Sequence, residues 1–137
     1  MILIINTTDH DNLKIHLVKD GNSFWTKQVS AKFKQAEKLL KTIEVMLEKR
    51  GLDKNDLTGI GVVSGPGGFT AIRIGVVTSN TFSYALKIPI VELKQIEFDG
   101  DQELVNKIIT KLKKKKGKFN ISKNIVLPFY DREPNIG

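Results

Sequence analysis

The chain has 137 residues, of which 40% are hydrophobic, a length that suits one compact core and is short for two. It contains no cysteine, which excludes a disulfide framework and a thiolate metal site, and no window approaches the roughly 20 apolar residues of a membrane span. The formal net charge is +7, but most of it lies in a lysine-rich stretch at residues 101–118, so it does not by itself indicate a nucleic-acid-binding fold. Because the N-terminus has no secretory signal pattern, we expect a cytoplasmic protein.

The first 29 residues predict a three-strand meander. Ile2–Ile5 is apolar without alternation, which is typical of a strand buried on both faces. Leu13–Lys19 alternates apolar and polar residues, with His16 on the polar side, and therefore predicts a half-buried strand. Asp20–Asn22 contains residues that tolerate positive φ, so Ser23–Val29 is predicted to form the second arm of a hairpin.

An amphipathic helix is predicted next, with Ser30 as its N-cap and Gly51 as its end. Its apolar positions recur at steps of three and four residues: Phe33, Ala36, Leu39, Leu40, Ile43, Met46 and Leu47. Gly59–Ser64 then predicts a second buried strand and Thr70–Leu86 a second helix.

Ile88–Val91 predicts a short last strand, which Pro89 places at a strand start or at a sheet edge. Three antiparallel strands followed by α-β-α-β is the element order of a ribonuclease-H-like half-domain, so we expect an α/β fold of that kind. We assign residues 1–95 to this domain, residues 96–123 to a lysine-rich helix (Glu103 to about Lys115) with a linker, and residues 124–137 to a C-terminal tail.

The loop Ser64–Gly68, S-G-P-G-G, has two interpretations. Its glycines allow positive φ and close backbone approach, which is sufficient to turn a strand into a helix. The helix start also presents free N–H groups to an anion, but the loop lacks the spacing of a P-loop and of a dinucleotide fingerprint. Arg73 is the only nearby cation. We therefore favour the structural turn over an anion site.

Other candidate groups for chemistry are sparse. A metal site built from Asp9, His10, Asp11 and His16 is the alternative to a solvated turn between two strands, which we favour. Asp131, Arg132 and Glu133 form either an acid/base group or, as we prefer, part of a docking tail. No serine, histidine and carboxylate constellation stands out, so we predict no catalytic residue, no metal and no cofactor.

Three segments carry a resemblance to a known family. G-P-G-G-F-T-A-I-R-I-G (65–75) resembles the G-P-G-S-F-T-G-L-R-I-G signature of the TsaB family, also called YeaZ. The opening I-I-N-T-T is similar to the family's I-x-D-T-S first strand, and P-F-Y-D-R-E-P near the C-terminus is similar to its terminal P-x-Y-L-R-E-P. The resemblance covers about the first 95 residues and about the last ten.

The resemblance implies a fold of the actin-like and sugar-kinase-like superfamily and a role as the non-catalytic partner in threonylcarbamoyladenosine (t6A) synthesis on tRNA. Gly68 and Ala71 stand where the family usually has serine and glycine. Asn6 stands where the superfamily places an acidic residue that helps to hold Mg²⁺. The second half-domain of the family is expected to be missing, which would leave one wall of the nucleotide cleft. We therefore predict a trimmed member that is not an enzyme.

The predicted helix Thr70–Leu86 is apolar on nearly all sides, which implies cover on more than one side. By the resemblance, this helix and the one from Ser30 dock on a TsaD-like catalytic subunit or on a second copy, and a TsaE-like ATPase is a further expected partner. The alternative is a helix buried wholly within this chain. The expected interface consists of Phe33, Glu37, Leu40, Phe69, Thr70, Arg73, Ile74, Val77, Thr78 and Thr81.

The lysine tract leaves a second function open. Lys113, Lys114, Lys115 and Lys116 are candidates for RNA contact, but the tract has no aromatic residue for base stacking, so a solvated helix end is favoured. We thus expect a non-catalytic scaffold subunit of a t6A-forming complex that reaches tRNA through that complex. The alternatives are an autonomous RNA-binding module and a residual hydrolase.

Overall fold

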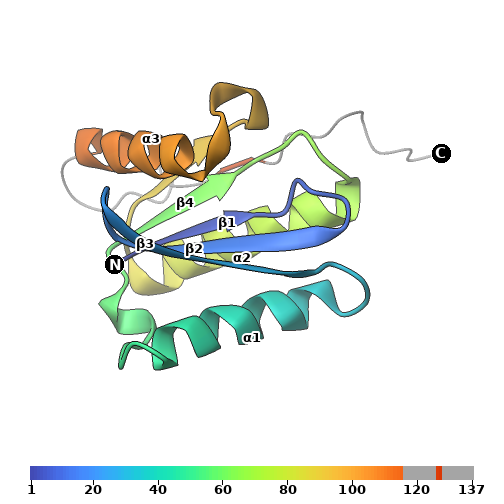
Figure 1. The fold of residues 1–137 in the computed structure, drawn as a ribbon, viewed down its shortest axis with the longest axis horizontal. Helices are drawn as coiled ribbons and strands as arrows, with labels where there is room; N and C mark the ends of the chain where they lie inside the picture. Colours follow the sequence, from blue (N-terminus) through green and yellow to red (C-terminus); the bar gives the residue numbers. More distant parts are fainter. Residues whose placement is uncertain (116–125, 128–137) are drawn as a thin grey trace.

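The structure of the chain is a computed structural model that describes residues 1–115 together with Val126 and Leu127. A single sheet with the strand order β3-β2-β1-β4-β5 lies between two layers of helices. Helices α1 (Gln35–Glu48) and α2 (Phe69–Leu86) cover one face of the sheet, and α3 (Gly100–Lys114) covers the other (Figure 1).

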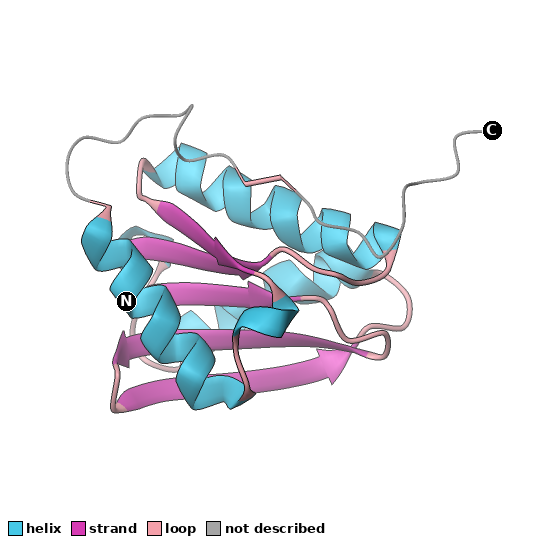
Figure 2. Cartoon of the chain, turned by 90° about the horizontal axis from the view of Figure 1, so that it is seen from above, coloured by secondary structure: helices cyan, strands magenta, loops and turns pink. Residues whose placement is uncertain are grey.

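The sheet is antiparallel on one side of β1 (Ile2–Asn6) and parallel on the other. β1 pairs antiparallel with β2 (Asn12–Asp20), which pairs antiparallel with β3 (Ser23–Ser30). β4 (Gly59–Val63) is parallel to β1, and β5 (Ile90–Leu93) is parallel to β4 (Figure 2). The predicted α/β element order is confirmed, and β5 is an edge strand, as the proline before it indicated.

Two short 3-10 helices complete the described chain. η1 (Lys54–Asp56) leads into β4, and η2 (Gln95–Glu97) follows β5. The helix predicted at Glu103 begins three residues earlier, at Gly100. The predicted linker at 117–123, the acidic and basic residues at 131–133 and the P-F-Y-D-R-E-P segment lie outside the described residues.

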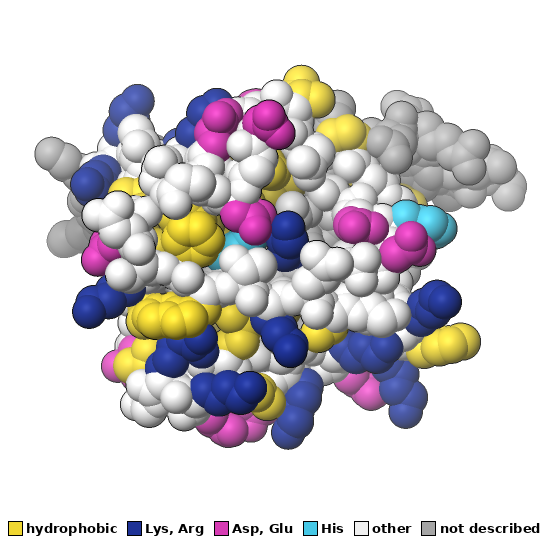
Figure 3. Space-filling view, in the orientation of Figure 1, with side chains coloured by type: hydrophobic (Ala, Val, Ile, Leu, Met, Phe, Trp, Pro, Cys, Tyr) yellow, Lys and Arg dark blue, Asp and Glu magenta, His cyan; other side chains and the backbone are white. Residues whose placement is uncertain are grey.

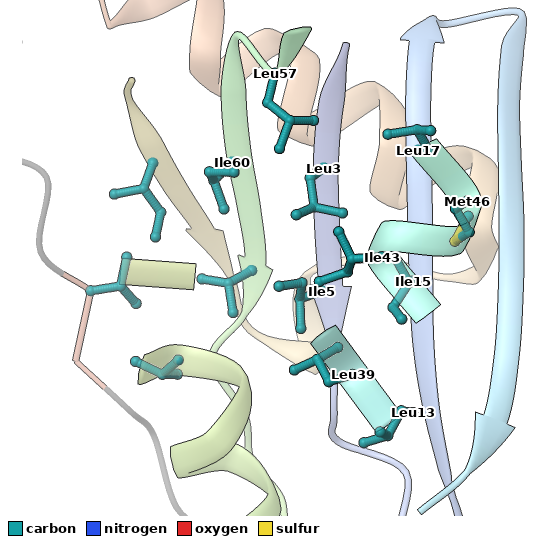
Figure 4. Packing of buried hydrophobic residues seen from close by; sticks show 14 of the residues in the cluster. Leu3, Ile5, Leu13, Ile15, Leu17, Leu39, Ile43, Met46, Leu57 and Ile60 are labelled. Atoms are coloured by element: carbon teal, nitrogen blue, oxygen red, sulfur yellow. The ribbon is translucent and has the colours of Figure 1, made fainter. Parts of the chain in front are cut away.

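The main hydrophobic core lies between the sheet and the α1–α2 layer (Figure 4). Leu3 and Ile5 of β1 point into it, together with Ile15 of β2 and with Leu39 and Ile43 of α1 (Figure 4). This core holds α1 and α2 on the same face of the sheet.

A second core under α3 explains why β1 is apolar without alternation. Ile4 of β1 packs in this core with Leu104, Val105 and Ile108 of α3. A Cβ added to Gly61 of β4 would lie 2.7 Å from the Ile108 side chain, so the glycine allows the helix to approach. α3 follows the domain predicted at residues 1–95, and it packs on the sheet of that domain.

The position of α3 shows that the predicted burial of β2 was partly wrong. Leu13–Lys19 was expected to be half-buried, yet the His16 side chain is fully buried because α3 lies over its face of the sheet. The helix that covers this face is distant in sequence, so the alternation in β2 could not reveal its burial.

The hairpin turn was placed correctly, but its mechanism differs. Gly21 does not have positive φ. Instead, the backbone N–H of Asn22 donates to Asp20 Oδ1 at 2.8 Å, and this local hydrogen bond closes the turn.

The predicted start of the first helix was wrong. Ser30 pairs with Asn12 as the last residue of β3, and the neighbouring Ala31 N–H donates to the carbonyl of Asp11. Phe33 and Lys34 both have positive φ, so α1 begins only at Gln35. Continued pairing with β2 thus outcompetes the capping preference of a serine.

Candidate partner interface

The glycine-rich loop turns the chain from β4 into α2, the structural role predicted from the sequence. Gly65 has φ 128, and the Gly65–Pro66 peptide bond is cis. Of the two expected uses of these glycines, Gly65 supplies the positive φ and Gly67 the close approach, since a Cβ added to Gly67 would lie 2.8 Å from the Ile72 side chain. Gly68 does not have positive φ. α2 starts directly afterwards, at Phe69.

The inner face of α2 consists of apolar and small residues that approach the sheet closely. Ile72 and Val76 are buried in the main core. A Cβ added to Gly75 would lie 2.5 Å from Thr7 Oγ1, so only glycine fits between α2 and the end of β1. The hydroxyl of Ser79 donates to the carbonyl of Gly75 at 2.7 Å. The buried hydroxyl of Ser79 is thus bonded within the helix, whereas that of Ser83 donates to the carbonyl of Ile88, just after it.

The outer face of α2 is exposed and partly apolar. Val77 is 54% exposed, and Phe69, Arg73 and Thr81 are also exposed on this side of the helix. In the described part of the chain α2 is therefore not covered all round. Within residues 1–115, 126 and 127, these exposures do not fit the hypothesis of a helix buried wholly within the chain.

Tyr84 extends this stripe and was missed in the predicted interface. It is 62% exposed and follows Thr81 by three residues, a spacing that places it on the same side of the helix. That spacing was the available signal. Ile74 and Thr78, which were included in the prediction, are half-buried at the side of the stripe.

α1 contributes a second row beside α2. Glu37 and Leu40 are exposed on α1. Phe33 was predicted inside this helix but lies in the loop before it, where its side chain is 86% exposed and its φ is 56. The loop is held by a hydrogen bond from Gln35 Nε2 to the carbonyl of Ala31 at 2.7 Å. An aromatic ring is thus presented to solvent from a loop that is fixed by internal hydrogen bonds.

A groove of about 300 Å³ lies between the two helices. It is lined by Ala36 of α1 and by six residues of α2: Phe69, Thr70, Arg73, Ile74, Val77 and Thr78. All six of these α2 residues belong to the predicted interface. Ala36 was assigned only to the helix pattern, and its contribution depends on how α1 lies against α2.

The end of β1 forms a separate polar pocket of about 380 Å³. Asn6 Oδ1 accepts hydrogen bonds from the backbone N–H of Thr8 at 3.0 Å and from its hydroxyl at 2.6 Å. Thr8 Oγ1 also lies 2.7 Å from Gln95 Oε1. The amide oxygen of Asn6 is therefore engaged within the chain, at the position where the resemblance implies an acidic residue.

The residues weighed for a metal do not gather in one place. Asp9 Oδ1 accepts from the backbone N–H of Asp11 at 2.8 Å, and this bond lowers the pKa of Asp9. His16 is buried under α3, with Nδ1 2.8 Å from Thr26 Oγ1. Among residues 1–115, 126 and 127, no three histidine or carboxylate side chains are grouped as metal ligands.

Burial and charge act in opposite directions on His16. Removal from water, with a smaller contribution from Lys14, lowers its pKa to about 4, while the carboxylate of Asp101, 3.9 Å from Nε2, opposes this shift. Lys14 itself bonds Asp101 at 3.1 Å. His16 is therefore neutral at pH 7 and serves the packing of α3.

The lysines at the end of α3 fall into two groups, those that bond to β5 and those that are exposed. Lys111 Nζ donates to the carbonyl of Glu92 at 2.7 Å and Lys115 Nζ to that of Ile90 at 2.6 Å, both on the outer edge of β5. Burial lowers the pKa of Lys115. Lys113 and Lys114 are exposed, and the last candidate for RNA contact, at position 116, lies outside the described residues.

Comparison with known proteins identifies the family. The family model described as TsaD, tRNA N6-adenosine threonylcarbamoyltransferase, matches residues 29–99, more than half of the chain. The chain belongs to this family. The match includes α1, α2 and the groove between them. The predicted resemblance to part of TsaB is also confirmed.

Individual relatives include both TsaD and TsaB proteins. A tRNA N6-adenosine threonylcarbamoyltransferase of Dictyoglomus turgidum is 29% identical and covers 71% of this chain. The tRNA threonylcarbamoyladenosine biosynthesis protein TsaB of Bacillus subtilis is 28% identical and covers 70% of it. The chain spans 34% and 42% of the lengths of these two relatives.

The solved structures agree with the fold. YeaZ from Pseudomonas aeruginosa superimposes with a TM-score of 0.62 at 22% identity, over 68% of this chain and 43% of that one. Together with the family match, this likeness confirms the predicted α/β, ribonuclease-H-like half-domain fold. No helix in the described ranges is long and apolar enough to cross a membrane.

Proposed function

We propose that this chain is a non-catalytic subunit in t6A synthesis, which docks on a TsaD-like enzyme through the outer face of α1 and α2. The observation that carries the proposal is the exposed apolar surface on these two helices and on the loop before α1. Leu40 and Val77 are both more than half exposed, and Phe33 and Tyr84 are exposed further. Clusters of exposed aromatic and aliphatic side chains beside a groove are typical of partner interfaces.

The proposed partner follows from the family relationship. Curated relatives of this chain are named as the transferase itself and as a biosynthesis protein of the same modification. Two chains of similar fold can pack helix against helix when each presents an apolar helix face. A second copy of this chain is the alternative occupant of the same face, and a TsaE-like ATPase remains a predicted third component.

The non-catalytic role rests on the polar pocket at the end of β1. Asn6 offers an amide where Mg²⁺ coordination would use a carboxylate, and its oxygen already accepts two hydrogen bonds from Thr8. We therefore expect no ATP hydrolysis and no nucleotide binding tighter than about millimolar, which corresponds to roughly 4 kcal/mol. Calorimetry with Mg-ATP tests this, and micromolar binding would contradict it.

The docking proposal predicts a large effect of Val77→Glu. The variant should fold normally, because Val77 is more than half exposed, but it should weaken binding to the TsaD-like enzyme by about 2–4 kcal/mol, since a charge would be buried without a partner. Size-exclusion chromatography and calorimetry of the mixed proteins measure the binding, and circular dichroism verifies the fold.

Ile96→Glu is the matched control. Ile96 lies in η2, outside the proposed interface, and is 86% exposed, so the same type of change should leave the complex intact. A folded Val77→Glu protein that binds as tightly as the Ile96→Glu protein would refute the assigned face. Loss of a homodimer in the variant, without any binding of the wild type to the enzyme, would assign the face to a second copy.

A further inference from the structure

The two edges of the sheet differ in what covers them. At the β5 edge, Lys111 and Lys115 of α3 donate to backbone carbonyls of the strand. At the other edge, β3 pairs with β2 from Ser23 to Ser30, and no other described strand pairs with it. The outward backbone groups of β3 are therefore open to a further strand.

A groove of about 650 Å³ runs beside this open edge, between β3 and α1. Its lining combines Val29 and Ser30 with five residues of α1 and the loop before it: Lys34, Glu37, Lys38, Lys41 and Thr42. The lysine side chains contribute aliphatic stems as well as ammonium groups. Such a groove can hold the side chains of an extended segment that pairs with β3.

The charge around the groove is positive. Residues 23–50 contain seven lysines and arginines but only three glutamates. Figure 3 shows Lys and Arg side chains gathered over β3 and α1 in the lower half of the molecule. Lys38 Nζ donates to the carbonyls of Ser30 and Lys32, whereas Lys27, Lys34 and Lys41 form no ion pair within the described residues. The groove therefore complements an acidic ligand.

An aromatic residue at the other end of β3 argues against single-stranded RNA as that ligand. Trp25 has the Arg50 guanidinium 4.3 Å from its ring centroid. That cation occupies one face of the ring, so Trp25 is a poor platform for base stacking. An open strand edge, in contrast, offers hydrogen bonds that match a peptide backbone.

We propose that the β3 edge binds an extended acidic segment of a partner protein as an additional strand. The segment would pair with the β3 backbone, place alternate aliphatic side chains in the groove beside Val29, and direct its carboxylates to Lys27, Lys34 and Lys41. This groove shares no lining residue with the α1–α2 groove, although Glu37 belongs to both the β3 groove and the α1 face proposed for docking. The inference does not require the proposed function.

The probe for the experiment is a short synthetic peptide of alternating valine and glutamate. We expect calorimetry with the full chain to detect binding, and amide hydrogen exchange to show new protection in Phe24–Val29. The same peptide methylated on alternate backbone nitrogens along its pairing edge should not bind, because it keeps the charge but loses the donors.

Charge reversal supplies matched variants. Lys34→Glu combined with Lys41→Glu should weaken peptide binding about tenfold or more, whereas Lys113→Glu with Lys114→Glu, on α3, should have little effect. Each pair changes the net charge equally, so the comparison separates local from overall attraction. Circular dichroism checks the fold of both.

Three results would overturn the proposal. The first is absence of peptide binding, and the second is peptide binding without protection of the β3 amides. The third is binding of polyuridine, in place of the peptide, that is weakened by Lys34→Glu with Lys41→Glu, because it would assign the surface to RNA.

Discussion

α2 and α3 lie on opposite faces of one sheet and use their apolar residues differently. α3 buries Leu104, Val105 and Ile108 completely, while its outer side carries polar and charged residues such as Lys113. α2 buries Ile72 and Val76 but also leaves apolar side chains exposed on its outer face. The folded chain thus buries the main apolar residues of α3, and it leaves part of the apolar surface of α2 exposed.

This difference shows why helix composition alone is a poor guide to an interface. An amphipathic helix such as α3 is complete once one side is covered. α2 has apolar residues on two sides, and the sheet can cover only one of them. The outer residues of α2 are exposed, so they contribute little to the stability of the fold. They can therefore contact a partner without loss of stability in this chain.

The largest expected effect is on stability, and it compares a buried position of α3 with an exposed position of α2. Ile108→Ala should lower the free energy of unfolding by about 2–5 kcal/mol, because it opens a cavity in the α3 core. Val77→Ala should change it by less than about 0.5 kcal/mol, because Val77 is exposed. Urea unfolding monitored by circular dichroism measures both, and equal losses would remove the distinction between the two helices.

The next effect tests the α3 face through pH. His16 has a folded pKa of about 4, below the usual 6.5, so protonation favours the unfolded chain. The contribution of neutral His16 to the free energy of unfolding is fully present above pH 6.5. It should fall by about 3 kcal/mol as the pH decreases from 6.5 to 4. His16→Leu should remove this part of the pH dependence in urea unfolding. An unchanged slope would show that His16 is not the group responsible.

The smallest expected effect concerns the outer side of α3 and the residues after it. If Lys113 to Lys116 contact tRNA in an assembled complex, replacing all four with glutamine should weaken tRNA binding by the complex. The salt dependence should also flatten, by about one counterion for each phosphate group that the variant no longer neutralises. Filter binding over a salt series measures this. An unaltered slope would favour a solvated helix end.

The sequence by itself determined the order of the elements and the family. Strand and helix patterns depend on local periodicity, so β1, β4, α2 and the hairpin were predicted to within a few residues. The glycine-rich loop also carried its own signal, because glycine permits backbone conformations that other residues avoid and proline fixes φ. The exposed stripe on α2, from Phe69 to Thr81, was predictable for a similar reason, since three- and four-residue steps define a helix face.

Only the tertiary structure decided which faces are covered. Burial of His16 and engagement of Lys111 and Lys115 depend on α3, which is distant in sequence from β2 and lies beside β5 only after folding. The position of Phe33 depends on the pairing of Ser30 with β2, which delays the start of α1. The basic groove at β3 was hidden in the sequence, because Val29 and Ser30 of β3 meet the lysines of α1 and of the loop before it only in the fold. Contacts between distant segments decide which side chains are buried and which charged groups remain without an ion pair. No local sequence pattern predicts those contacts.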